Sequence, residues 1–123
     1  MEKKKKISTP RRSEIWLVNF DPTLGAEIRK TRPALILQND VANAHSPVTI
    51  VAAVTSQFNP PLYPTEVLVQ RGEGGLTEES AILLNQIRTI DNVRLIRRVG
   101  MITSDTMIRV GGALKISLGL VEI

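Results

Sequence analysis

Residues 48–54 read Val48-Thr-Ile-Val-Ala-Ala-Val54, a nearly continuous apolar run that decides the fold of this 123-residue chain. β-Branched residues favour strands, and an apolar run of this length is typical of a strand buried on both faces. Further strand-like runs lie at Glu14–Phe20, Pro33–Gln38, Thr65–Gln70, Ala81–Ile90 and Arg97–Ile102. Because turn residues separate these runs, the sequence predicts a sheet of five or six short strands around residues 48–54.

One helix is expected, after the last strand. Thr103 or Ser104 can cap its N-terminus, and Asp105 suits the positive end of the helix dipole. Apolar residues then recur at helical spacing, at Met107, Val110, Leu114 and Leu118. Gly111 and Gly112 inside the helix would allow a second backbone to approach, or a kink. The pattern predicts a mainly β (α+β) fold, a small and strongly curved β-barrel with a C-terminal α-helix packed on it.

The composition excludes several classes of site. The chain is 42% hydrophobic and 23% charged, which is typical of a globular domain. It has no cysteine, which excludes disulfides and thiolate sites, and its single histidine argues against a multi-histidine zinc site. No apolar run approaches the roughly 18 residues of a membrane span, and no apolar segment follows the basic N-terminus. We expect a cytoplasmic protein with no metal, no cofactor and no membrane partner.

The formal charge of +4 is concentrated at the N-terminus. Residues 1–12 carry six basic side chains and one acidic side chain, a net charge of +5. Residues 13–123 carry ten basic and eleven acidic side chains, a net charge of −1. We expect a basic, flexible arm over residues 1–11 and one domain over residues 12–123. Nucleic-acid binding by that domain must then depend on particular arginines rather than on overall charge.

The connection between the first two strands, Asp21–Arg32, is the first candidate site. It is too long for a tight hairpin, and it ends with Arg29, Lys30 and Arg32. The following proline favours an extended backbone at Arg32, which would hold the guanidinium at the start of the second strand. A solvated hairpin tip is the alternative, in which Glu27 forms an ion pair with the loop cations.

Polar residues on two later strands are the second and third candidates. Thr55 and Ser56 end the apolar run, where a hydroxyl could bind a ligand or satisfy a nearby backbone group. Gln86 and Arg88 share one face of their strand by alternation. Such groups can bind base edges and phosphates, or form an exposed polar face. The simplest interpretation of the remaining basic groups is a solvated surface, at His45, Arg94, Arg97 and Arg98.

In their order along the chain, these segments resemble the MazF/PemK family of toxin endoribonucleases. The strongest match is Ile82-Leu-Leu-Asn-Gln-Ile-Arg-Thr-Ile-Asp91, and the similarity covers residues 12–123. The resemblance implies an SH3-like barrel of five to seven strands that forms a homodimer. It also implies a toxin of a type II toxin–antitoxin system that cleaves single-stranded RNA, often mRNA, at short sequences without a metal. A cognate antitoxin would inhibit the enzyme, and DNA would be contacted only through the toxin–antitoxin complex.

The resemblance also assigns residues. The catalytic arginine and threonine of the family fall on Arg32 and Thr55, and its substrate-contacting glutamine falls on Gln86. The remaining expected substrate contacts are Arg88, Glu27, Ser56, Tyr63 and Pro64. The stretch Glu27-Ile-Arg-Lys-Thr31 departs from the small, glycine-containing stretch common in the family, which bears on sequence preference.

Metal-free cleavage of RNA uses the 2′-hydroxyl as nucleophile and gives a 2′,3′-cyclic phosphate and a 5′-hydroxyl. The guanidinium of Arg32 suits the developing negative charge and is a candidate acid, and Thr55 can donate a further hydrogen bond. Use of Arg32 as a base would demand a very large fall in the pKa of its guanidinium, so the general base stays unassigned. Two alternatives remain open: a toxin of the same fold that inhibits a protein such as DNA gyrase, and a non-catalytic RNA-binding protein.

Overall fold

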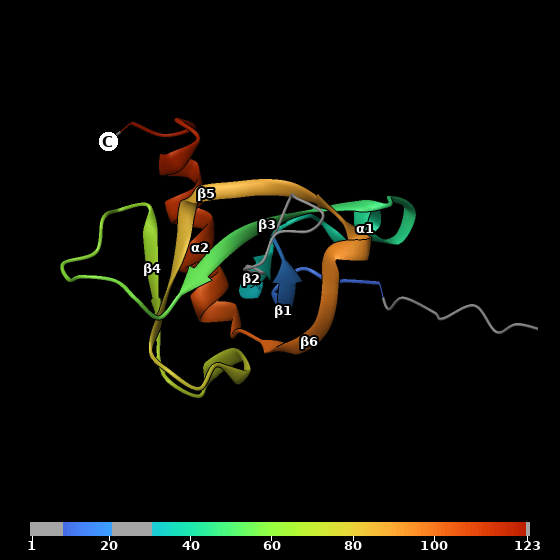
Figure 1. Ribbon diagram of the computed structural model, residues 1–123. Coiled ribbons are helices and arrows are strands. Elements are labelled where there is room, and N and C mark those ends of the chain that lie inside the picture. Colours follow the sequence, from blue (N-terminus) through green and yellow to red (C-terminus); the bar gives the residue numbers. More distant parts are fainter. Residues whose placement is uncertain (1–8, 21–30, 123) are drawn as a thin grey trace, which may run out of the picture.

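The computed structural model describes residues 9–20 and 31–122 (Figure 1). Six strands form one antiparallel sheet in the order β4-β5-β3-β2-β1-β6. The strands are β1 (Glu14–Asn19), β2 (Thr31–Ile36), β3 (Val48–Thr55), β4 (Glu66–Val69), β5 (Ser80–Asp91) and β6 (Leu95–Met101). The helical elements are α1 (Asp40–His45), α2 (Ser104–Ser117) and the 3₁₀ turns η1 (Glu73–Gly75) and η2 (Asn92–Arg94).

Strand β3 lies at the centre of the sheet, between β2 and β5, and it separates two apolar clusters. Ala52 and Val54 belong to the larger cluster, and Val51, on the opposite face of the strand, belongs to the smaller cluster. The predicted burial of both faces is therefore confirmed for this part of the strand, although Ile50 is 36% exposed. Because side chains alternate across a strand, two buried faces fix its register on each neighbour.

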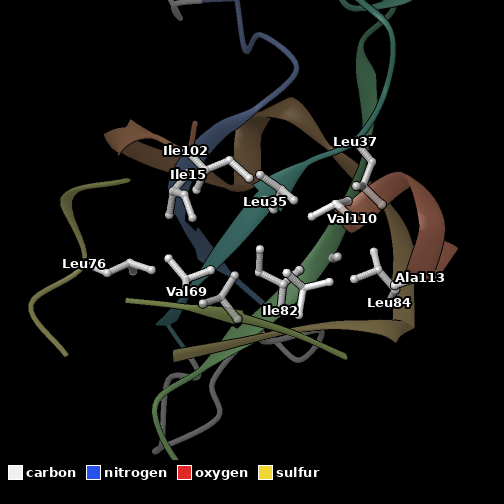
Figure 2. Packing of buried hydrophobic residues seen from close by; sticks show 13 residues of the cluster. Ile15, Leu35, Leu37, Val69, Leu76, Ile82, Leu84, Ile102, Val110 and Ala113 are labelled. Atoms are coloured by element: carbon white, nitrogen blue, oxygen red, sulfur yellow. The ribbon is translucent and has the colours of Figure 1, made fainter. Parts of the chain in front are cut away.

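Helix α2 covers the larger cluster, as the sequence predicted. Figure 2 shows Val110 and Ala113 of the helix directed towards side chains of the sheet such as Leu84. Thr103 is the N-cap, and its Oγ1 accepts a hydrogen bond of 3.2 Å from the Thr106 amide. Leu118 was expected on the apolar face but is the C-cap residue and 51% exposed, since the helix ends one residue earlier.

The mainly β class with a C-terminal helix is confirmed, and six strands fall within the expected number. The sheet is strongly curved around the larger cluster, with the long strand β5 paired to both β3 and β4 (Figure 1). Among the described residues it is an open sheet rather than a closed barrel, because β4 and β6 are its two edges.

The expectation of a single helix was wrong, because residues 40–45 form the short helix α1. Asn39 caps it, accepting a hydrogen bond of 2.8 Å from the Ala42 amide. Asn43 is buried and accepts a hydrogen bond of 2.8 Å from Thr49. Six residues are too few to show an apolar helical period, so the asparagine cap was the only local signal.

Arg98 is also more than a solvated charge. Its Nε lies 2.6 Å from a carboxylate oxygen of Glu14, whose side chain is buried. Glu14 also accepts hydrogen bonds from the indole of Trp16 at 3.0 Å and the amide of Arg11 at 2.8 Å. Arg94 donates to the carbonyl of Asn19 at 3.2 Å. These arginines therefore connect β6 and the turn before it to the first strand.

The turn η1 packs closely against β6 and is tied to the start of α2. A Cβ atom on Gly75, whose φ is +77°, would lie 2.3 Å from the Val99 carbonyl oxygen, so only glycine fits here. One carboxylate oxygen of Glu73 accepts hydrogen bonds from the amide of Thr103 at 3.1 Å and from the hydroxyl of Thr106 at 2.6 Å. Arg109 donates to Thr106 at 3.2 Å and to the carbonyl of Leu68 at 3.0 Å. Glu73 thereby joins η1 to the helix that covers the core.

Burial raises the pKa of Glu73, but the hydrogen bonds from Thr106 and Thr103 and the charge of Arg109 offset this effect and hold the pKa below its ordinary value. The ionised carboxylate therefore stabilises the folded state above the pKa of the unfolded chain, about 4.3, and this contribution is lost as the pH falls through the lower folded pKa. Glu73→Gln should lower the free energy of unfolding by about 1–2 kcal/mol at pH 7. Urea unfolding at pH 7 and pH 3 should show that the difference from wild type shrinks at the lower pH. The exposed Glu79→Gln is the control and should behave like wild type at both pH values.

Candidate active site

The two residues expected to be catalytic lie on neighbouring strands. Arg32 is the second residue of β2, and Thr55 is the last residue of β3. Each lies two residues beyond the antiparallel pair formed by Ala34 and Ala53, on the same side of it. Arg32 and Thr55 both line a cavity of about 380 Å³, which we call the central cavity.

The far wall of the central cavity comes from the connection between η1 and β5. The polar residues that line the whole cavity are Arg32, Thr55, Ser56, Thr77, Glu78 and Ser80. The site thus combines one guanidinium, several hydroxyl groups and one carboxylate. Neither Thr77 nor Glu78 was a candidate from the sequence, because both follow a glycine-rich turn whose path could not be predicted locally.

A second cavity, of about 210 Å³, shares Arg32 and is lined also by Phe20, Ala53, Gln86 and Arg88. The predicted common face of Gln86 and Arg88 is confirmed, and both lie beside Arg32. The guanidinium carbon of Arg88 is 5.2 Å from the centre of the Phe20 ring, a cation–π contact that orients it. Phe20 was expected only as the end of a strand.

A bulge in β5 positions Gln86. The pairing between β3 and β5 changes from Ala52 opposite Ile87 to Ala53 opposite Leu83. Adjacent residues of β3 therefore face residues of β5 that are four apart, so residues 84–86 lie outside the ladder. Such an irregularity bends the strand and redirects side chains, and here it accompanies the exposure of Gln86.

A third cavity, of about 480 Å³, shares Thr55 and Gln57 with the central cavity. It is lined also by Phe58, Asn59, Pro60, Pro61, Tyr63, Glu66 and Leu83. The Tyr63 side chain is 71% exposed, whereas Pro64 is not among the lining residues. Because the central cavity shares residues with each of the other two, the three cavities are neighbours from Arg88 past Arg32 and Thr55 to Tyr63, and we call them together the groove.

The Thr55 hydroxyl also satisfies the local backbone, which was the alternative interpretation of this residue. Its Oγ1 accepts a hydrogen bond of 3.0 Å from the Gln57 amide and donates one of 3.2 Å to the Gln57 carbonyl oxygen. Thr55 also lines two cavities, and a ligand that accepts the proton of its hydroxyl would replace the contact with the Gln57 carbonyl. Glu27, the remaining candidate, lies outside the described residues.

Within residues 9–20 and 31–122, no group of three or more histidine, aspartate or glutamate side chains could hold a metal ion. In the same part of the chain, no helix is long and apolar enough to cross a membrane.

Comparison with known proteins agrees with this arrangement. The sequence model of the family described as "PemK-like, MazF-like toxin of type II toxin-antitoxin system" matches residues 11–118. Endoribonuclease MazF of Staphylococcus epidermidis is 42% identical over 110 residues, which cover 89% of this chain and 92% of the relative. The crystal structure of MazF from Deinococcus radiodurans superposes with a TM-score of 0.74 at 26% identity, covering 91% of this chain and 98% of that chain. A MazE–MazF structure from the same organism gives a TM-score of 0.78 at 26% identity, covering 93% and 99%.

The fold and these matches define the class of the protein as a toxin of a type II toxin–antitoxin system. Within this class, the chain belongs to the PemK-like, MazF-like family of toxin endoribonucleases. The family resemblance stated from the sequence is confirmed.

Proposed function

We propose that this toxin cleaves single-stranded RNA, mRNA included, at a short sequence and without a metal ion, by attack of the 2′-hydroxyl on the adjacent phosphorus. The products are a 2′,3′-cyclic phosphate and a 5′-hydroxyl. The observation that carries the proposal is the convergence of Arg32 and Thr55, from two strands, on one cavity. Family membership supports the reaction class.

In this proposal, the scissile phosphate binds in the central cavity. The planar fork of Arg32 can donate to two phosphate oxygens and stabilises the charge that develops during attack. Thr55 and Ser56 supply hydroxyl donors from the end of β3. Since β3 is fixed by burial on both faces, these groups need little rearrangement when substrate binds.

The two outer cavities are proposed to bind nucleotides on either side of the phosphate. Gln86 and Arg88 present amide and guanidinium donors to base edges, beside the aromatic face of Phe20. Tyr63, with Pro64 next to it in the chain, offers an aromatic surface for stacking in the third cavity. We propose Glu27 as a further contact from the connection before Arg32. Only unpaired bases can enter such subsites, because paired A-form RNA hides their edges.

Cleavage of a long mixed-sequence RNA in EDTA tests this function. The wild type should give discrete fragments with cyclic phosphate ends, and Arg32→Ala should reduce the rate by about 10²–10³-fold through loss of charge stabilisation. Arg71→Ala, which removes an exposed arginine outside the three cavities, is the matched control and should cleave like wild type.

Intact RNA with the wild type would reject the proposal. Intact RNA together with inhibited DNA supercoiling would support the gyrase alternative, and RNA that shifts on a gel without cleavage would indicate a binding protein.

We further propose that the toxin acts in the cytoplasm, where a cognate antitoxin covers the groove and blocks RNA. The MazE–MazF structure from D. radiodurans is the precedent for a partner of this kind. Contact with DNA is proposed only for the toxin–antitoxin complex.

The outer face of α2 supports a homodimer. Ile108 is 73% exposed, and a Cβ on Gly111 or Gly112 would meet no described atom within 4 Å other than the neighbouring residues and backbone of the helix itself. Leu118 and Leu120 beyond the glycines are 51% and 69% exposed. This side of the helix also carries the exposed Lys115, but the exposed apolar residues and the two glycines allow close packing of a second copy.

Light scattering at micromolar concentration should therefore give the mass of a dimer. Ile108→Glu should shift the protein towards monomer, because it places a charge in the proposed interface. Val41→Glu on α1, at a residue that is 76% exposed, is the control and should leave the mass unchanged. A monomeric wild type would contradict the proposal.

We propose that the basic residues 1–11 are an arm outside the domain of residues 12–123 and that cleavage does not need residues 1–10. The amide of Arg12 donates to Asp40 at 2.7 Å, and this hydrogen bond, with the charges of Arg11 and Arg12, holds the pKa of Asp40 below its ordinary value. These contacts favour a truncation that removes residues 1–10 and keeps Arg11 and Arg12. A chain that lacks residues 1–10 loses four lysines and Glu2, so its binding to non-target RNA should weaken and depend less on salt. Its cleavage rate on target RNA should stay within about threefold of wild type; a complete loss would assign a catalytic role to the arm.

A further inference from the structure

The proposed cleavage needs a group that accepts the proton of the 2′-hydroxyl. Arginine is protonated at neutral pH, so Arg32 cannot accept it in its resting state. Among the described residues, Glu78 is the only carboxylate that lines the central cavity with Arg32 and Thr55, and Arg32 is the only other charged residue there. The groove has one more described carboxylate, Glu66, but it lines only the third cavity and accepts a hydrogen bond from the Tyr63 amide at 2.9 Å.

Glu78 stands on a supported part of the chain. Its backbone carbonyl accepts a hydrogen bond of 2.9 Å from the hydroxyl of Ser80, which is the buried first residue of β5. Leu76, two residues earlier, is buried in the larger apolar cluster. The segment that carries Glu78 is thus anchored at both ends, whereas Glu78 itself is exposed. In the described part of the chain, no cationic nitrogen lies within 4 Å of a carboxylate oxygen of Glu78, so Glu78 forms no ion pair there.

A glutamate among the residues that line a cavity proposed to bind RNA also requires an explanation. A negative charge there repels the phosphate, so it weakens substrate binding unless it has a role in the reaction. Acceptance of a proton at the moment of attack is such a role, because the carboxylate is neutralised as negative charge builds on the phosphate.

We propose that Glu78 is the general base of the cleavage reaction, an inference that rests on the proposed function. The Glu78 carboxylate takes the proton from the 2′-hydroxyl, and the freed electron pair of O2′ forms the bond to phosphorus. The bond from phosphorus to O5′ breaks, and its electron pair stays on O5′, which takes a proton from water or from the guanidinium of Arg32. Glu78 then releases its proton to solvent, and Arg32, where it was the donor, takes one back from solvent, so the enzyme returns to its starting state without any co-reactant.

The test uses single-turnover cleavage, in EDTA, of a synthetic RNA that carries one mapped site. Glu78→Gln should lower the rate by about 10²–10⁴-fold, the usual contribution of general base catalysis. Its affinity for the same RNA with a 2′-O-methyl group at the scissile position should be equal or higher, because a negative charge has been removed. The matched control is Glu79→Gln, which changes a neighbouring exposed glutamate outside the cavity and should cleave like wild type. Glu78→Asp should restore part of the rate, because it keeps the carboxylate.

Two further measurements separate a base from other roles. The wild-type rate should fall on the acid side of the pH profile, and this acid limb should be absent in Glu78→Gln. A substrate with a 5′-bridging sulfur needs no acid for its leaving group, so the defect of Glu78→Gln should persist on it. Recovery on this substrate would make Glu78 an acid and overturn the proposal.

Glu27 is the competing base, since its segment precedes Arg32 in the chain. A normal rate and acid limb in Glu78→Gln, with both lost in Glu27→Gln, would overturn the proposal in favour of Glu27. These outcomes are read only against a wild type that cleaves in EDTA; if it leaves the RNA intact, the proposed function itself has failed.

Discussion

Burial of β3 on both faces is the constraint on which the rest of the structure depends. Val51 packs into one cluster, while Ala52 and Val54 pack into the other, so a slip by one residue would exchange the two sets of side chains. The register of the strand on its neighbours is therefore fixed, and with it the position of Thr55, its last residue. The neighbouring strand β2 is held in the same way, because Leu35 faces one cluster and Ala34 faces the other. Arg32 and Thr55 thus take their positions from the core rather than from contacts with each other.

The groove is assembled from parts of the chain that are held by different means. Its floor comes from the packed strands β2 and β3, whereas one wall depends on the turn η1, which Glu73 links to α2. Helix α2 lies far from the groove in sequence but stabilises it indirectly, since the same helix covers the larger cluster and holds η1 in place. Loosening this contact would disturb the wall that carries Thr77 and Glu78 before it disturbed the strands.

Local patterns in the sequence were sufficient for the strands and for the C-terminal helix, because alternation, β-branching and the Thr103 cap act over a few residues. The helix α1 was missed because it is shorter than two turns. The ion pair between Glu14 and Arg98 could not be predicted, since it joins residues 84 positions apart. The residues of the groove divide in the same way between local and long-range signals. The sequence predicted as site candidates those that lie on strands, namely Arg32, Thr55, Gln86 and Arg88. It did not predict Glu78, because this residue follows a turn whose path depends on close backbone packing at Gly75.

The bulge in β5 has a consequence for how such a protein can diversify. Residues 84–86 lie outside the ladder, while the pairs on either side of them hold β5 to β3. Gln86 lines the second cavity, and a change of its side chain removes no hydrogen bond between β3 and β5 at those pairs. If the proposed role of Gln86 holds, selection can act on the RNA sequence preference at this position almost independently of folding stability. Such a scaffold could then acquire new targets through single substitutions, while its core and the positions of Arg32 and Thr55 at their strands stay the same.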